Sequence, residues 1–514
     1  MKDVSAVRQP SHRSRRRAVA TIVSILALAA VQALAGPAAG AQGTTDWPNY
    51  LSDKSGDSFT PETLITPANA PSLKARPGWP VHLAGTLSAQ PVVTNGFIYQ
   101  GTWAGYEYAL CETACNGHAS GFTAWRTDLG KSSTTTCETA NIGIASTAAV
   151  ASVTLPGATS PTSLLFVGGG GNVVPAGLQQ GASIFALDAM TGAIKWQTVL
   201  GASPATLIWS SPVVHTPTNA TVPSVYIGVA SFDDCPLVRG ALVQLNAATG
   251  AVQHTFYTVP EGCVGGGVWG TPTIDPATGY LYVATGNADH CSVAEPNAVS
   301  VLKLRSSDLA LVNHWQLPMA EWADDPDFGS VPTLFRGTVT PGGKNRALLG
   351  IPNKNGIYYV LDRNNLSAGP VARLTIAIAG GCPDCGQGSI SPAAYDGQHI
   401  YVAGGTSQYG SKTVPGVLRA FDPNNLGKPL WQHALNSGPV LGAVTAAPGV
   451  VVVGEGHTMV MVGSADGKTL FSHNVNTINT TSPAIFYAPV SIAHGMVLEG
   501  DTHAYLYLYS VNGT

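Results

Sequence analysis

One strand pattern recurs at a nearly constant distance along the chain. In five copies a short, mostly apolar run ends in a polar residue, and these residues are Asp188, Asn246, Arg305, Asp362 and Asp422. The intervals between them are 58, 59, 57 and 60 residues. Weaker copies that end at Arg126, Ser464 and Ser510 bring the total to eight units. Such a repeat indicates a supersecondary unit that buries its apolar faces against its neighbours.

The residues within each unit favour β-strands. A second motif recurs as SSPVV at 210–214, GTPTI at 270–274 and SVPTL at 330–334, and short runs of β-branched and aromatic residues follow it. Four-stranded units repeated every roughly 40 to 60 residues are typical of a β-propeller. We therefore predict an all-β, eight-bladed β-propeller. Because the ring must close, we expect the N-terminal segment after Gln42 to add a strand to the blade that contains Ser510.

The composition agrees with a compact β protein and excludes other classes. The 514 residues include 59 Gly and 36 Pro, while 45% are hydrophobic and only 11% are charged. This balance argues against a disordered chain, a coiled coil and a basic nucleic-acid binder.

Residues 1–41 have the pattern of a secretory signal peptide. A basic stretch around Arg13 to Arg17 precedes the apolar run Ala18 to Ala35, and small residues end at Ala41. A membrane anchor is the alternative, but the run is short for one. We predict a secreted or periplasmic protein in which residues 42–514 form a single propeller domain. Without the leader the net charge falls from −4 to about −9, which argues against nucleic-acid or anionic-membrane partners.

All eight cysteines lie after residue 41, and an even number in an exported chain predicts disulfides. The short spacings of Cys111 with Cys115 and of Cys382 with Cys385 permit local bridges. A zinc site at the second pair is the alternative. Neither pair continues into the CxxCH motif of covalent haem attachment.

A longer motif resembles a known family. Residues 186–196 read ALDAMTGAIKW, which matches AxDxxTGxxxW. This resembles the tryptophan-docking repeat of pyrroloquinoline quinone (PQQ)-dependent alcohol dehydrogenases, whose Trp packs between blades. The resemblance covers most of residues 42–514 and implies a structural role for Trp196. The run Asp327-Phe328-Gly329 is most similar to secreted members of the polyvinyl-alcohol dehydrogenase type.

The resemblance also implies a floor and a metal ligand for the cofactor. Residues 268–270 and 280–287 are similar to the family stretch in which a Trp lies under the quinone and an Asn ligates calcium. These roles map to Trp269 and Asn287. An indole suits a tricyclic quinone because both are flat aromatic systems. The structural alternatives are a blade-packing Trp and an Asn that follows a strand end.

Two further stretches resemble the catalytic part of the family. An Asp before an aromatic residue corresponds to Asp327, which the resemblance implies to be the catalytic base and to lie beside calcium. Residues 352–363, PNKNGIYYVLDR, resemble the segment whose cation contacts the quinone oxygens, which assigns cofactor binding to Lys354 and Asn355. The alternatives are a polar loop with three Asp residues and a solvated turn lysine.

Two family features differ in this chain. Cys235 stands where the family carries a calcium-ligating Glu, and Asp233 and Asp234 just before it are candidate substitutes. Calcium prefers hard oxygen ligands, so a cysteine is a poor replacement. The disulfide between adjacent cysteines that many members hold over the quinone is also missing, and the sequence does not identify Cys382 and Cys385 as its equivalent.

The sequence therefore supports an exported PQQ- and calcium-dependent dehydrogenase that oxidises a secondary or polymeric alcohol. Since no haem motif is present, we expect an external electron acceptor. The alternative is a propeller that has lost its cofactor and serves as an extracellular binding or scaffold protein, since fold alone does not determine function. A hydrolase or lyase is disfavoured because the chain lacks GxSxG and HExxH motifs.

Overall fold

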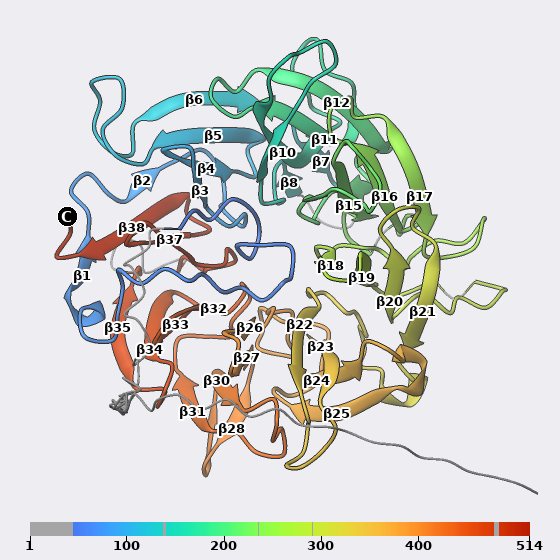
Figure 1. Cartoon of the computed structure of the whole chain (residues 1–514), viewed down its shortest axis with the longest axis vertical. Helices are drawn as coiled ribbons and strands as arrows, with labels where there is room; N and C mark the ends of the chain where they lie inside the picture. The colour runs from blue at the N-terminus through green and yellow to red at the C-terminus, as the bar shows by residue number, and fades with distance from the viewer. Residues whose placement is uncertain (1–44, 137–139, 235, 290, 477–482) are drawn as a thin grey trace, which may run out of the picture. The chain divides into compact units, whose positions relative to one another are not determined.

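The computed structural model describes residues 45–136, 140–234, 236–289, 291–476 and 483–514. These residues form eight antiparallel sheets of four or five strands, arranged in a ring around a central channel (Figure 1). The prediction of an eight-bladed all-β propeller is confirmed. The described residues include no helix long and apolar enough to cross a membrane. The predicted signal peptide at residues 1–41 lies outside the described part of the chain.

Each blade takes its strands from a continuous stretch of chain, except at the point of closure. The blades are numbered 1 to 8 in chain order, and the strands of each are given from the channel outward. Blade 1 has β3 (Val92–Thr94), β4 (Phe97–Gly101), β5 (Tyr106–Cys111) and β6 (Thr123–Asp128); blade 2 has β9 (Ala149–Val153), β10 (Thr162–Gly171), β11 (Gly181–Asp188) and β12 (Ile194–Gly201); blade 3 has β14 (Val213–His215), β15 (Ser224–Ser231), β16 (Ala241–Asn246) and β17 (Val252–Tyr257); blade 4 has β18 (Thr273–Asp275), β19 (Tyr280–Ala284), β20 (Ser300–Arg305) and β21 (Leu311–Gln316). Blade 5 has β22 (Thr333–Gly337), β23 (Arg346–Pro352), β24 (Ile357–Asp362) and β25 (Pro370–Thr375); blade 6 has β26 (Ala394–Tyr395), β27 (Ile400–Gly404), β30 (Gly416–Phe421) and β31 (Trp431–Leu435); blade 7 has β32 (Thr445–Ala447), β33 (Val450–Glu455), β34 (Thr458–Gly463) and β35 (Thr469–Asn474); blade 8 has β36 (Ser491–Ala493), β37 (Met496–Gly500), β38 (Tyr505–Val511) and β1 (Leu73–Ala75).

The remaining elements are short. They are the strands β2 (Val81–His82), β7 (Ser132–Thr134), β8 (Ala140–Ile142), β13 (Thr206–Leu207), β28 (Ser407–Tyr409) and β29 (Lys412–Val414), and the 3₁₀ helices η1 (Ala70–Ser72), η2 (Met319–Glu321) and η3 (Leu366–Ala368).

The repeated pattern corresponds to the third strand of each blade, with one correction. In blades 2 to 5 the polar residues end β11, β16, β20 and β24 as expected. In blade 1 the third strand is β5, whereas Arg126 lies in the fourth strand, β6. The assignment of Arg126 to the repeat was therefore wrong. A loop closed by the Cys111–Cys115 disulfide replaces the usual turn after β5, so the turn residues that mark the other copies are missing there.

The ring closes as predicted. Strand β1 pairs antiparallel with β38, with Leu73 opposite Val511 and Lys74 opposite Ser510. In Figure 1 the blue β1 accordingly lies beside the red β38. Blade 8 therefore combines strands from both ends of the described chain, which ties the first segment to the last.

The residues before β1 cross the central channel. The Tyr395 amide of blade 6 donates to the Asp57 carbonyl (2.7 Å), and the Ile274 amide of blade 4 donates to that of Lys54 (2.8 Å). Trp47 forms a bridge with Val93 of blade 1. Figure 1 shows this blue segment in the middle of the ring. These contacts tie the segment to the innermost strands of blades 1, 4 and 6.

Trp196 joins two blades, as the repeat implies. Its Nε1 donates to the Ala247 carbonyl (3.1 Å) in the turn of the next blade. Gly250 of that turn lies against the indole, and a Cβ there would be only 2.6 Å from a ring carbon. Trp125 and Trp431 make the same bond to Ala189 and Ser464.

Three disulfides are present among the described residues, at Cys111–Cys115, Cys263–Cys291 and Cys382–Cys385. The two predicted local bridges are confirmed. The zinc alternative for Cys382 and Cys385 is wrong because each sulfur is bonded to the other. Cys137 and Cys235 lie outside the described residues.

Candidate active site

A cavity of about 210 Å³ opens where loops of blades 3, 4 and 5 meet beside the channel. Four of the five residues predicted from the sequence line it, and they come from four separate loops. These residues are Trp269, Asn287, Asp327 and Lys354. The fold thus gathers side chains that span 85 residues of sequence.

Lys354 lies between two carboxylates. Its Nζ donates to Asp325 Oδ2 (2.5 Å) and to Asp327 Oδ2 (3.1 Å). The backbone N–H of Asn287 donates to Asp327 Oδ1 (2.5 Å). Asp327 and Lys354 are 6% and 8% exposed, so their charges depend on each other rather than on water.

Hydrogen bonds to backbone carbonyls join the turn that carries Lys354 to the loop that carries Asp325 and Asp327. The Asn353 side chain donates to the carbonyls of Pro326 (2.7 Å) and Asp327 (2.9 Å). The Lys354 amide donates to the Asp327 carbonyl (3.2 Å). The turn that carries the lysine is therefore fixed on the loop that carries the carboxylates.

Burial and neighbouring charge shift the titration of this cluster. Burial raises the pKa of Asp327 to about 6, although Lys354 acts in the opposite direction. Burial lowers the pKa of Lys354, but the carboxylates of Asp327 and Asp325 outweigh it and raise that pKa overall. Burial and the Asp325 charge raise the pKa of Asp234. At neutral pH the lysine therefore stays protonated.

Trp269 differs from the tryptophans that join blades. Gly329 lies flat against its indole, and a Cβ at that glycine would be 2.0 Å from two ring carbons. Lys354 Nζ is 5.3 Å from the ring centroid. Among the described residues no turn carbonyl accepts a bond from its Nε1, unlike that of Trp196. The indole is supported from behind by backbone and lines two cavities, which favours a stacking surface over a packing role.

The structure does not bring Asn355 into this cavity. Its Nδ2 donates to the Glu321 carbonyl (2.8 Å) and to the Tyr359 hydroxyl (2.7 Å), and its Oδ1 accepts from the Ile357 amide (3.1 Å). The side chain is thus committed to the turn beneath Lys354. It braces this turn and does not face the cavity.

Oxygen donors suited to a hard cation line the same cavity. Asp234, a predicted substitute for the missing Glu, is there with Asn287, Asp325 and Asp327. Asp325 Oδ1 is buried without a hydrogen-bond partner in the described structure. Such a donor set fits calcium in chemistry. Among the described residues of this cavity, no three acidic, His or Cys ligand atoms lie within 4.8 Å of one another. A bound cation therefore requires these side chains to converge. Cys235 lies outside the described residues.

A second cavity of about 340 Å³ continues into the channel. Trp209 and Trp269 line both cavities, and Trp103, Tyr487 and Tyr50 extend the aromatic wall. Several hydroxyl side chains also face it, among them Ser88, Thr147, Ser211 and Thr271. Lys354 is the only Lys or Arg among the described residues that line the two cavities. The combined space offers flat aromatic surfaces, hydroxyl groups and a single cation.

Sequence reasoning missed part of this site. Asp325 belongs to the polar loop with three Asp residues and has no role in the sequence analysis, and Trp103, Trp209 and Tyr487 belong to none of the motifs described above. The loop around the Cys382–Cys385 disulfide, which the sequence analysis does not assign to the site, lies against the cluster: the Gly380 amide donates to the Lys354 carbonyl (3.2 Å). Only a conspicuous pattern such as the CxxC pair itself could have drawn attention to this loop.

Comparison with known proteins places the chain in a family. The profile for "Glucose/ethanol/alcohol dehydrogenase, beta-propeller domain", named PQQ, matches residues 47–367. The chain belongs to this family. The resemblance predicted from the docking repeat is thus confirmed, and membership suggests a PQQ cofactor and a metal ion.

Individual relatives are distant. A polyvinylalcohol dehydrogenase from Pseudomonas sp is 26% identical over 461 residues, which cover 81% of this chain and 65% of the relative. Quinohemoprotein alcohol dehydrogenase ADH IIB of Pseudomonas putida is 28% identical over 60% of this chain and 44% of its own length. The chain thus spans less than two thirds of the length of these relatives. The crystal structure of a quinohemoprotein alcohol dehydrogenase from Comamonas testosteroni superposes with a TM-score of 0.65 at 18% identity, covering 91% of this chain and 81% of the other, which shows a common fold.

Proposed function

We propose that this protein is an exported PQQ- and calcium-dependent dehydrogenase that oxidises a secondary or polymeric alcohol. The observation that carries the proposal is the cluster of buried Asp327 and Lys354 with the half-buried Asp325, beside the indole of Trp269. A scaffold propeller has no need to bury two charges at a cavity, since buried charges cost stability unless they are well paired.

The residues divide into those that would hold the quinone and those that would hold the metal. Trp269 would stack on the quinone, and Lys354 would contact its oxygens. Asn287 and Asp327 would ligate calcium, with Asp234 and Asp325 as further oxygen donors. When bound, PQQ supplies a two-electron acceptor that takes a hydride from the carbinol carbon. Repeated turnover would require an external electron acceptor.

The chain's own residues would manage the proton and the geometry. The Asp327 carboxylate would take the hydroxyl proton of the alcohol as the carbinol C–H bond breaks, which leaves a carbonyl compound. Lys354 keeps its proton and would orient the acceptor oxygen by a charge-assisted hydrogen bond. The aromatic walls would exclude water and hold the carbinol group in place beside Asp327.

Ligand binding by the purified protein tests this proposal without relying on turnover. We expect added PQQ with calcium to change the quinone absorbance and to raise Tm, because a ligand at 100 times its Kd stabilises the native state by about 2.7 kcal/mol. Lys354→Met is expected to weaken PQQ binding roughly tenfold or more, since hydrogen bonds to charged groups contribute about 1.5–3 kcal/mol. Lys468→Met is the control, because that lysine is paired on the surface of blade 7.

An unchanged absorbance and an unchanged Tm at high PQQ and calcium would contradict the cofactor assignment and leave the scaffold alternative. Calcium alone, titrated by calorimetry, separates the metal from the quinone. Asp327→Asn should reduce calcium affinity, whereas the exposed Asp466→Asn should not.

A further inference from the structure

The loop from Gly380 to Gly388 connects the charged cluster to the aromatic wall. Besides the bond from the Gly380 amide to the Lys354 carbonyl (3.2 Å), Gly381 lies directly against the Asp325 side chain. The Cys382–Cys385 disulfide closes the loop, and the Cys385 amide donates to the Cys382 carbonyl (3.1 Å). The loop is therefore short, braced and fixed to two residues of the site.

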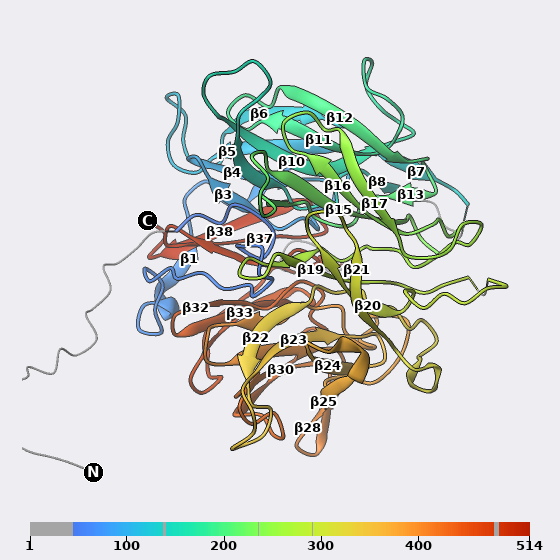
Figure 2. The ribbon, with the colours of Figure 1, turned by 45° about the vertical axis from the view of Figure 1, so that its right-hand side comes forward.

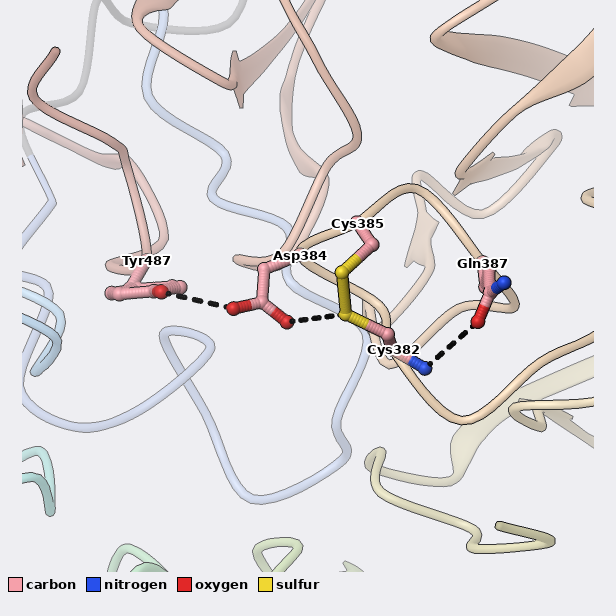
Figure 3. The surroundings of a disulfide bond; sticks show 5 residues. All are labelled: Cys382, Asp384, Cys385, Gln387 and Tyr487. Carbon is pink, nitrogen blue, oxygen red and sulfur yellow. Dashed lines mark hydrogen bonds between the residues drawn. A yellow bond between two sulfur atoms is a disulfide. The ribbon is translucent and has the colours of Figure 1, made fainter. Parts of the chain in front are cut away.

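From this loop Asp384 reaches across to blade 8 (Figure 3). The Tyr487 hydroxyl donates to Asp384 Oδ2 (3.4 Å). Burial first and then Asp384 raise the pKa of Tyr487 to about 12, so the phenol keeps its proton. The other Asp384 oxygen lies 3.6 Å from Cys382 Sγ, and a disulfide sulfur has no proton to donate. Asp384 is exposed, so this oxygen is free to accept a hydrogen bond from a ligand.

Tyr487 continues the aromatic wall. Its ring stacks on Trp103 at 9° with centroids 6.5 Å apart, and Trp103 meets Trp209 edge to face at 75° and 6.5 Å. The Trp103 Nε1 donates to Ser88 Oγ (2.8 Å), which fixes its ring. Trp209 in turn borders the cavity that holds Asp327 and Lys354. A continuous aromatic surface thus runs from the charged cluster of Asp327 and Lys354 to the Asp384 carboxylate.

We propose that Tyr487, Trp103 and Asp384 bind the part of the alcohol that does not react. Methylene groups would lie on the aromatic faces, and a second hydroxyl would donate to Asp384. This subsite selects extended alcohols with further hydroxyl groups over monohydric alcohols. The inference rests on the proposed function, which it deepens by naming the residues that determine specificity.

Kinetics with two alcohols of equal chain length tests the subsite. For holoenzyme, 2,4-pentanediol carries the second hydroxyl and 2-pentanol lacks it. Asp384→Asn should lower kcat/KM for the diol about tenfold, mainly through KM, because the second hydroxyl then loses its charged hydrogen-bond acceptor. The value for 2-pentanol should change less than twofold. Equal losses for both alcohols, or no loss for either, would overturn the proposal.

The disulfide provides an independent variant. Cys382→Ser combined with Cys385→Ser should produce the same selective loss for the diol, because Asp384 is then no longer held toward Tyr487. The matched control is Cys111→Ser with Cys115→Ser, which opens a loop of similar size on blade 1. Tyr257→Phe and Asp466→Asn control for the loss of an exposed phenol and an exposed carboxylate.

Binding to the protein without PQQ separates this inference from the proposed function. An oligomer of vinyl alcohol should quench the tryptophan fluorescence of the wild type and leave that of Tyr487→Ala nearly unchanged. If no alcohol is oxidised but this difference appears, the proposed function fails and the subsite stands. If the oligomer quenches both proteins equally or neither, the subsite is refuted even in an active enzyme.

Discussion

Glu107 illustrates how a buried carboxyl group affects this protein outside the candidate site. The side chain in β5 is fully buried, and neither of its oxygens has a hydrogen-bond partner among the described residues. Burial raises its pKa well above the ordinary value. The folded state therefore favours the protonated form, which differs from Asp327, whose carboxylate has two donors.

This difference predicts a pH-dependent effect of Glu107→Gln. A raised folded pKa means that stability is greatest below the unfolded pKa, about 4.3, and falls as pH rises toward the folded pKa. The glutamine variant does not titrate and therefore avoids this loss of stability at higher pH. We expect its Tm to be higher than that of the wild type at pH 7 and similar near pH 4. Thermal unfolding at both values checks this, with the exposed Glu261→Gln as control. A variant less stable than wild type at pH 7 would contradict it.

The turn and the tryptophan that join adjacent blades act as a unit. Trp196 donates to the turn of blade 3, Thr198 Oγ1 donates to the Gly250 carbonyl (2.7 Å), and Gly250 lies on the indole. Such contacts repeat between blades 1 and 2 and between blades 6 and 7. They explain why the motif keeps Gly and Trp even though neither approaches the candidate site.

Gly250→Ala is expected to destabilise the protein more than Gly279→Ala. Both glycines have positive φ, 71° and 69°, so the backbone strain is similar. A Cβ at Gly250 would meet the indole at 2.6 Å, whereas the nearest atom to one at Gly279 is 3.6 Å away. Overpacking typically costs about 1–3 kcal/mol, and the difference between the two variants in denaturant unfolding should fall in that range. Equal destabilisation would show that the indole contact contributes nothing.

Closure of the ring depends on contacts between distant segments. His494 of blade 8 bonds through Nδ1 to Glu112 (2.7 Å) and through Nε2 to Asp46 (2.9 Å). Asp46 precedes the segment that crosses the channel, and Glu112 follows β5. Thr94 Oγ1 also donates to Asp46, and Arg76 donates to the Glu112 carbonyl. This cluster ties the N-terminal segment, blade 1 and blade 8 together.

His494→Asn should therefore lower stability in a pH-dependent way. Burial lowers the pKa of His494, but hydrogen bonds and charge from Glu112 and Asp46 raise it overall. The contribution to stability is complete below the unfolded pKa of about 6.5 and is lost as pH rises through the folded pKa. We expect a Tm deficit near pH 5.5 that shrinks toward pH 9. His254→Asn, on an exposed strand, is the control, and a deficit that grows with pH would contradict the assignment.

Local patterns were sufficient to predict much of this protein. The regular spacing of the repeat copies from Asp188 to Asp422, together with their alternating strands, predicted the number and order of the blades. This was possible because a strand and the turn after it depend mainly on neighbouring residues. The motifs also identified Trp269, Asn287, Asp327 and Lys354, which the ring brings to one cavity. The same approach misplaced Arg126, since the disulfide loop after β5 removes the local turn signal.

Only the tertiary structure decided which side chains face each other. Asn355 follows Lys354 directly, yet its amide turns toward Glu321 and Tyr359 and away from the cavity. Asp384 and Tyr487 are 103 residues apart and meet because blades 6 and 8 flank the same channel mouth. Loop positions of this kind depend on closure of the whole ring, which no local periodicity encodes. The sequence by itself determined the repeated unit and pointed to four residues that line the candidate site, and the packing of eight such units determined the shape of the pocket around them.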